Sequence, residues 1–320
     1  MWKFNPIFKS TIWGGEKIKE FKQAATEQRQ IGESWELSGV EGSESVVATG
    51  PDAGMTLSAL IEKYGARLMG ERNLKRFGHR FPLLIKFIDA SADLSVQVHP
   101  NDELAQKRGE NNGKTEMWYV IANGKGARLA NGFNRPLDPS EYEGLVESGK
   151  IEDVLNFVEV HPGDTFYIPA GRVHAIGKGC FVAEIQQTSD ATYRIYDYHR
   201  KDADGNERQL HTELAKDAIN FGDTDGNPVN YIAKEDIPVT LVKSPFFTTN
   251  LLMIDESLIR DYKESDTFVV LIATEGRARV TCAGETLDMH AGETILVPAS
   301  ACGLTIEPQG KFTALETFIS

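Results

Sequence analysis

Short apolar runs, separated by Gly and Pro turns, fill the C-terminal part of the chain. They are Val239–Lys243, Leu251–Ile254, Phe268–Ala273, Ala278–Cys282, Thr294–Pro298 and Leu304–Glu307. None of these runs has helical spacing, and many short strands with such turns are typical of a β-sandwich or β-barrel. Nearer the start of the chain, Ile31–Ser38 alternates apolar or aromatic residues with polar ones, which predicts a strand with one buried face.

Three segments interrupt the strands with the spacing of an amphipathic helix. Met55–Phe77 has an apolar residue every three or four positions and a capping threonine, Thr56, near its start. Asp138–Glu141 combines a capping Asp, a Pro at the first helical position and a Glu three residues after the cap, so a short helix is expected from there to about Lys150. Leu210–Phe221 is the third. The pattern predicts a mainly β chain with a few inserted α-helices.

A ten-residue stretch occurs twice. His161–Ala170 reappears as His290–Ala299, with most positions identical or conservatively replaced. Chance rarely produces such a match, so we expect one β architecture to be used twice. We place the division between residues 1–235 and residues 236–320.

One predicted strand, Leu94–Pro100, carries polar side chains on a single face. Ser95, Gln97 and His99 share that face because side chains of a strand alternate. Pro100 lacks a backbone donor, which places His99 at the end of the strand, where sites usually open. Gln97 and His99 are therefore candidate metal ligands on neighbouring pleats.

Two further candidates, Glu116 and His174, follow later in the chain. Carrying the repeat forward aligns His174 with Gly303, and aligning the apolar strand before each repeat places Glu116 against Thr267. The second copy lacks both side chains. We expect any metal to bind the first copy alone.

Lys86 is the single charge in the apolar run Phe81–Ile88. A buried lysine is costly unless it is paired or faces a polar cavity, so Lys86 either lies at a cleft or extends its amine to solvent. Trp13 precedes Gly14 and Gly15, which allow the backbone a close approach to another group. Trp13 either packs on the core or borders a site.

The composition excludes several classes of partner. The chain has 320 residues, 41% of them hydrophobic, and a net charge of −13 with acidic and basic residues mixed. Nucleic acid needs a clustered basic surface, so it is not an expected partner, whereas a small anion needs only a few basic side chains. The longest apolar runs are far below the roughly 20 residues that span a bilayer, and no signal peptide is evident, so we expect a cytoplasmic protein that does not bind membranes. Three widely spaced cysteines argue against disulfides and against a thiolate zinc site.

Five motifs together resemble the type I mannose-6-phosphate isomerase family, in its short bacterial form. They are Trp13–Gly15, Gln97–Pro100, Lys114–Glu116, Ile168–His174 and Ser189–Arg194. The Gly-Asp-Thr and Pro-Ala-Gly turns before His174 also resemble the second motif of the cupins. The resemblance runs in order across nearly the whole chain and implies two cupin-type jelly-roll β-barrels, the second of them degenerate.

The resemblance implies a role for each motif residue. One zinc ion per chain would be held by Gln97, His99, Glu116 and His174. The catalytic residues would be Arg194, Lys114 and Asp190, and the substrate-binding residues Lys86 and Trp13. Longer family members carry a histidine before the pocket lysine where this chain has Gly113, so a mechanism that needs that histidine is not expected here.

The implied reaction interconverts mannose 6-phosphate and fructose 6-phosphate through an enediol. Zinc and Arg194 would stabilise the developing oxyanion, and the proton carrier would be a lysine with a lowered pKa or a carboxylate with a raised one. Iron, manganese or cobalt would also fit the donors. The expected partner is a sugar phosphate, and the expected assembly a monomer or weak homodimer. The alternatives are an iron-dependent cupin oxygenase and a non-catalytic sugar-phosphate-binding cupin.

Overall fold

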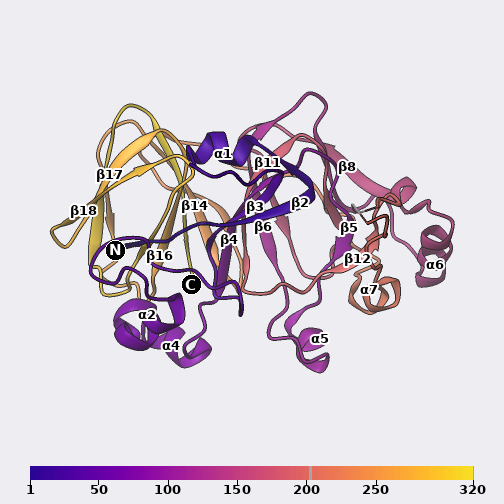
Figure 1. Cartoon of the computed structure of the whole chain (residues 1–320), viewed down its shortest axis with the longest axis horizontal. Helices are drawn as coiled ribbons and strands as arrows, with labels where there is room; N and C mark the ends of the chain where they lie inside the picture. The colour runs from indigo at the N-terminus through magenta and orange to yellow at the C-terminus, as the bar shows by residue number, and fades with distance from the viewer. Residues whose placement is uncertain (202–203, 320) are drawn as a thin grey trace.

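The computed structural model describes residues 1–201 and 204–319. They form two units, each made of two antiparallel sheets (Figure 1). The N-terminal sandwich consists of β2–β12, and the C-terminal sandwich consists of β13–β21 together with β1. The prediction of a mainly β chain with a few helices is confirmed.

The N-terminal sandwich has a six-stranded and a five-stranded sheet. In sheet order, the six strands are β2 (Ile7–Gly15), β3 (Ile31–Leu37), β4 (Leu83–Asp89), β11 (Cys180–Gln187), β6 (Glu116–Asn123) and β9 (Thr165–Ile168). The five strands are β12 (Tyr193–Tyr196), β5 (Val96–Val98), β10 (His174–Ile176), β7 (Arg128–Phe133) and β8 (Leu155–Glu159).

The C-terminal sandwich has a six-stranded and a four-stranded sheet. The six strands are β13 (Val239–Lys243), β14 (Thr248–Ile254), β21 (Phe312–Phe318), β16 (Val269–Glu275), β19 (Thr294–Val297) and β1 (Trp2–Lys3). The four strands are β15 (Leu258–Asp261), β20 (Gly303–Pro308), β17 (Arg277–Cys282) and β18 (Glu285–His290).

The two sandwiches share one topology. The order β3-β4-β11-β6-β9 reappears as β13-β14-β21-β16-β19, and β5-β10-β7-β8 reappears as β15-β20-β17-β18. The sequence repeat is therefore a repeat of the whole strand order. Strand β1 pairs with β19 through Trp2 and Leu296, so the predicted division after residue 235 leaves one strand of the C-terminal sandwich at the other end of the chain.

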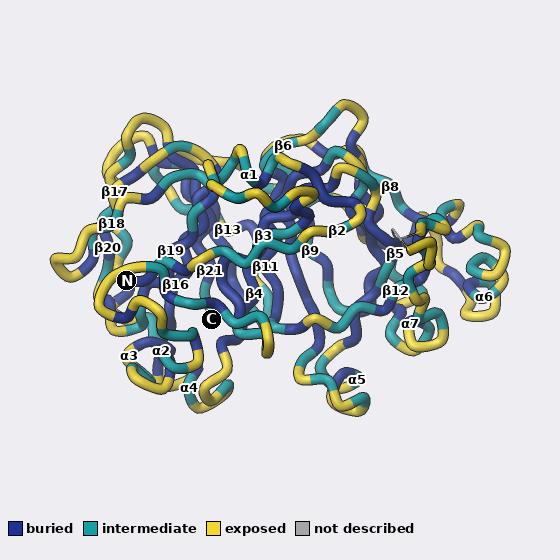
Figure 2. The backbone as a smooth tube through the Cα atoms, viewed as in Figure 1, coloured by how far each residue is buried: buried dark blue, intermediate teal, exposed yellow. Residues whose placement is uncertain are grey.

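The two six-stranded sheets pack against each other and form a large shared core. Leu83, Ile85 and Phe87 of β4 meet Leu315 and other apolar side chains of the C-terminal sandwich in that core. Figure 2 shows the central strands as buried along most of their length. A strand that is covered on both faces has a nearly continuous apolar sequence, because neither of its faces contacts water.

The opposite face of β4 points into the N-terminal sandwich. There Ile88 packs with Trp118 and Val182 in a separate core between the two sheets of that unit. Lys86 lies on this same face, two residues from Ile88, because side chains alternate along the strand. The interior of the N-terminal sandwich is thus apolar at one end and polar at the other.

Seven α-helices and one 3₁₀ helix occupy loops between the strands in the described part of the chain. They are α1 (Lys17–Lys22), α2 (Leu57–Tyr64), α3 (Ala66–Met69), α4 (Glu71–Phe77), α5 (Asp102–Lys107), α6 (Pro139–Glu147), the 3₁₀ turn Ile151–Val154 and α7 (Thr212–Ala218). The predicted caps are present: Thr56 accepts a hydrogen bond from the Ala59 amide, and Asp138 accepts one from the Ser140 amide.

The single helix predicted over Met55–Phe77 is wrong, because the segment forms three short helices. Gly65 and Gly70 separate them, with φ angles of +53° and +86° that side chains rarely adopt. A Cβ at Gly70 would lie 2.2 Å from the Asp266 carbonyl oxygen. The Asp266 carboxylate accepts hydrogen bonds from the first two amides of α4, so this contact between the sandwiches interrupts the helical pattern. None of the described helices is both long and apolar enough to cross a membrane.

Candidate metal centre and its cavity

A cavity of about 350 Å³ opens at the polar end of the N-terminal sandwich. Its lining includes six of the nine residues singled out in the sequence: Trp13, Lys86, Gln97, Lys114, Asp190 and Arg194. The other three, His99, Glu116 and His174, form a buried cluster whose ligand atoms all lie within 4.8 Å of one another. The structure therefore brings all nine candidates to one place.

Three strand ends position the cluster. Glu116 is the first residue of β6, His174 is the first residue of β10, and His99 directly follows β5. Glu116 Oε2 lies 3.5 Å from His99 Nε2, and Glu116 Oε1 lies 3.4 Å from His174 Nε2. The carboxylate thus lies between the two imidazoles, and all three side chains are almost fully buried.

Both imidazoles are oriented by backbone carbonyls. His99 Nδ1 donates to the Ala191 carbonyl oxygen at 2.8 Å, and His174 Nδ1 donates to that of Arg172 at 2.9 Å. The proton on Nδ1 leaves a lone pair on Nε2, which faces the cluster. Burial lowers the pKa of both groups, that of His174 to about 3, so both rings are neutral. Neutral imidazoles with a fixed tautomer are the form that binds a metal.

Glu116 Oε1 has no hydrogen-bond partner among the described residues, whereas Oε2 forms an ion pair with Lys114. Burial and the neighbouring Glu184 carboxylate raise its pKa. A buried carboxylate oxygen without a hydrogen bond is costly, and a divalent cation would compensate it. Gln97 Nε2 lies 3.4 Å from His174 Nε2, and a rotation of the amide would present the oxygen instead. The residues present therefore fit a metal.

Lys114 adds a positive charge at the edge of this cluster. Its Nζ lies 2.9 Å from Glu116 Oε2 and 3.1 Å from His99 Nε2. The amine is buried and already has a carboxylate partner.

The position of Lys86 resolves the alternative left open by the sequence. Its amine is buried in the cavity wall, 3.1 Å from Glu184 Oε1 and 3.4 Å from Glu33 Oε2. Although burial opposes the charged form, these two carboxylates raise the pKa of Lys86 above its ordinary value. Glu184 also accepts a hydrogen bond from Trp118 Nε1 at 3.0 Å. Lys86 is therefore a paired lysine at a cleft.

Arg194 and Trp13 also line the cavity. Arg194 Nη1 donates to the Gln209 carbonyl oxygen at 2.9 Å, whereas its buried Nε has no hydrogen-bond partner in the described chain. Burial lowers the pKa of Arg194, and the nearby Arg208 lowers it further. Trp13 is 5% exposed and packs on the apolar core while bordering the cavity, so both interpretations of its role hold.

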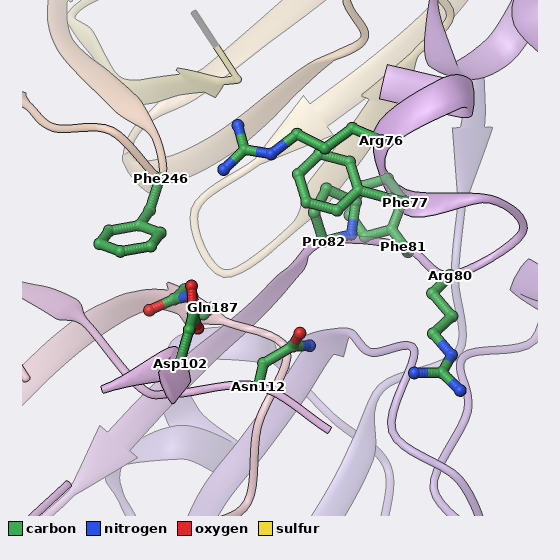
Figure 3. Close-up of a pocket in the computed structure, with 9 residues that line it drawn as sticks. All are labelled: Arg76, Phe77, Arg80, Phe81, Pro82, Asp102, Asn112, Gln187 and Phe246. Atoms are coloured by element: carbon green, nitrogen blue, oxygen red, sulfur yellow. The ribbon is translucent and has the colours of Figure 1, made fainter. Parts of the chain in front are cut away.

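The sequence did not single out the residues that hold the Lys114 segment. Asp102 Oδ1 accepts hydrogen bonds from the Gly113 amide at 2.8 Å and from Gln187 Nε2 at 3.0 Å, and Gln187 Oε1 accepts one from the Thr115 amide at 2.9 Å. Figure 3 shows Asp102 and Gln187 at a separate cavity that Phe77 and Phe246 also line. A Cβ at position 113 would lie 2.5 Å from the backbone of Asn101, so the close packing here requires Gly113.

The equivalent place in the C-terminal sandwich holds a different set of side chains. Tyr119 pairs with Thr165 in the first copy and Ile272 pairs with Thr294 in the second, so Glu116 corresponds to Val269. The alignment with Thr267 was two residues out of register. Among the described residues, the only metal-binding group of His, Cys, Asp and Glu is the one at Glu116.

A buried carboxylate nevertheless lies at the equivalent position of each copy. Glu184 pairs with Trp118 on β6, and Glu316 pairs with Leu271, the equivalent residue on β16. In the second copy Arg260 Nε and Nη2 bind the Glu316 carboxylate at 2.8 and 2.9 Å, and the Tyr262 hydroxyl also donates to it. In the second copy these side chains enclose the carboxylate.

The chain is similar to known isomerases along nearly its whole length. Residues 1–129 match the family model of the phosphomannose isomerase type I catalytic domain. The chain is 38% identical over 299 residues to ManA, a mannose-6-phosphate isomerase of Bacillus subtilis, with 92% of each chain covered. It is 33% identical to a mannose-6-phosphate isomerase of Streptococcus mutans, with 90% of this chain and 89% of the other covered.

Solved structures agree with these relationships. The crystal structure of the mannose 6-phosphate isomerase from Bacillus subtilis matches with a TM-score of 0.87 and 31% identity, and the match covers 99% of this chain and 98% of the other. A phosphomannose isomerase from Salmonella typhimurium, at 16% identity and a TM-score of 0.80, shares the fold.

Proposed function

Because the chain belongs to the type I mannose-6-phosphate isomerase family, we propose that it interconverts mannose 6-phosphate and fructose 6-phosphate with one bound zinc ion. The observation that carries the proposal is the Glu116 carboxylate, which is buried between two neutral imidazoles and whose Oε1 has no hydrogen bond in the described chain. With Gln97, the site offers two nitrogens and two oxygens. A set without thiolates that leaves room for substrate suits a catalytic zinc ion, and iron, manganese and cobalt accept the same donors.

The reaction moves a proton between neighbouring carbons through an enediol, and the obstacle is the weak acidity of the carbon-bound proton. The metal supplies a Lewis acid for the oxygen on which negative charge develops. Lys114 places a second positive charge next to the metal ligands, where it stabilises the same oxygen. Arg194 contributes from the cavity wall.

The carbon-bound proton needs a base that is not already paired. Glu33 and Glu184 are bound to Lys86, and Lys114 is bound to Glu116. Asp190 lines the cavity, is exposed, and forms no ion pair with any described residue. We therefore assign the proton transfer to Asp190. Its carboxylate can take the proton from one carbon and return it to the next.

A coupled assay for fructose 6-phosphate formation tests this proposal. The metal-loaded protein should convert mannose 6-phosphate, and in D₂O the product should gain deuterium, because a proton held on Asp190 exchanges with solvent. Asp190→Asn should keep the metal and lose both turnover and label. Absence of any fructose 6-phosphate would overturn the isomerase assignment: oxygen consumption would then indicate an oxygenase, and sugar-phosphate binding without product a non-catalytic cupin.

A further inference from the structure

The two pocket lysines are poor candidates for holding the phosphate of the substrate. Lys86 lies between Glu33 and Glu184, and Lys114 is paired with Glu116. Their positive charges are compensated within the cavity wall. A phosphate dianion placed there would also meet three carboxylates, and like charges at short range repel.

A second group of positive charges lies around Arg194. Arg208 lines the same cavity as Arg194, and Asp197 forms ion pairs with both Arg208 and Arg200. Asp197 is the one carboxylate of this group. No described carboxylate forms an ion pair with Arg194. Among the described ion pairs, Asp197 is shared by Arg200 and Arg208, so one carboxylate faces two guanidinium groups.

Asp197 holds Arg208 in a fixed orientation. Arg208 Nε lies 2.7 Å from Asp197 Oδ2, and Arg208 Nη2 lies 2.6 Å from Oδ1, while Arg200 Nη2 binds the same carboxylate. The Asp197 side chain is 5% exposed, whereas that of Arg208 is 27% exposed. A guanidinium bound along one edge keeps its remaining N–H groups free to donate. Arg208 is therefore both oriented and accessible.

We propose that Arg208 receives the phosphate ester and makes the site specific for phosphorylated sugars; this inference rests on the proposed isomerase function. A planar guanidinium forms paired, charge-assisted hydrogen bonds with phosphate oxygens. The phosphate and the reacting carbons lie at opposite ends of the substrate. One cavity that contains both the metal-side residue Gln97 and Arg208 can hold both ends.

The test compares Arg208→Ala with wild type on mannose 6-phosphate and on mannose. Loss of a charge-assisted contact should raise KM for mannose 6-phosphate roughly 10- to 100-fold, while kcat/KM for mannose stays unchanged. Inhibition by inorganic phosphate should weaken by a similar factor. Arg208→Lys should recover part of the loss, and it guards against misfolding because it keeps the charge next to Asp197.

Arg76→Ala is the matched control, because Arg76 is an exposed arginine at the separate cavity of Figure 3 and should leave all these constants unchanged. Equal losses on mannose and mannose 6-phosphate, or an unchanged KM for mannose 6-phosphate, would overturn the assignment of Arg208. Wild-type protein that does not convert mannose 6-phosphate would instead overturn the proposed function, so the two failures are distinguishable.

Discussion

Arg194 differs from the other basic residues of the cavity because no described carboxylate neutralises it. Its guanidinium is held only through the Gln209 carbonyl oxygen, and its Nε is buried without a partner. A group held in this way is suited to a charge that develops during the reaction. It contributes little to metal binding or to the core.

Arg194→Ala should therefore lower turnover and leave the rest of the protein intact. We expect kcat to fall by roughly two to three orders of magnitude, as when one oxyanion-stabilising donor is removed. Metal content should stay near one ion per chain, and the melting temperature should stay near that of wild type. Arg194→Lys should recover only part of the turnover, because an ammonium group does not reproduce a planar fork. Metal analysis, calorimetry and kinetics check these values, and loss of metal together with activity would mean that Arg194 supports the metal site instead.

Single residues also show what the sequence could indicate. The lone charge of Lys86 in an apolar strand indicated a cleft or a partner, and strand alternation placed Gln97 and His99 together. Glu184, the partner of Lys86, could not be identified in this way, because the pairing depends on the register of β4 with β11, nearly one hundred residues later. A single Glu in the apolar strand Cys180–Gln187 was the available signal.

At the level of elements, β11 and β21 carry the same buried carboxylate in two different settings. Glu184 lies beside the metal cluster and binds Lys86, whereas Glu316 is enclosed by Arg260, Tyr262 and Asn250. The two carboxylates thus occupy equivalent positions in the two sandwiches, but only Glu184 lines the cavity. The pair supplies a matched test.

Glu184→Gln should lower turnover by at least about tenfold, because Lys86 loses one of its two carboxylates and the charge around the site changes. Glu316→Gln should cost about 1–3 kcal/mol of unfolding free energy, since Arg260 loses its charged partner. The folded Glu316→Gln protein should keep wild-type turnover and one metal ion. Urea unfolding and steady-state kinetics on both variants measure these effects. Equal turnover losses in the two variants would contradict a purely structural role for the C-terminal copy.

Element boundaries were less predictable than element types. The caps at Thr56 and Asp138 were correctly predicted from local sequence, but the contact of Gly70 with Asp266 divides a helical pattern that looks continuous. The alignment of Glu116 failed for a related reason, because the pairing of β6 with β9 and of β16 with β19, rather than strand composition, fixes the register. A two-residue slip keeps the same face, so the sequence pattern gave no warning.

For the whole molecule, the C-terminal sandwich supports the N-terminal one. The outer faces of both six-stranded sheets form one core, so β4, β6 and β11 are buried on both sides. The strands that carry Lys86, Glu116 and Glu184 therefore pack against the C-terminal sandwich on the face opposite the cavity. The repeat was visible in the sequence, but this packing was not, because apolar periodicity does not say which surface a strand covers.

The central claim is that one divalent ion at His99, Glu116 and His174 carries the activity of the whole chain. It is tested most directly by removing metal with a chelator, adding zinc back stepwise and following fructose 6-phosphate formation from mannose 6-phosphate. Activity should rise linearly and reach its plateau at one zinc per chain, and His174→Ala should neither bind zinc at the site nor regain activity. A plateau at two ions per chain, full activity without metal, or restored activity in His174→Ala would contradict the account.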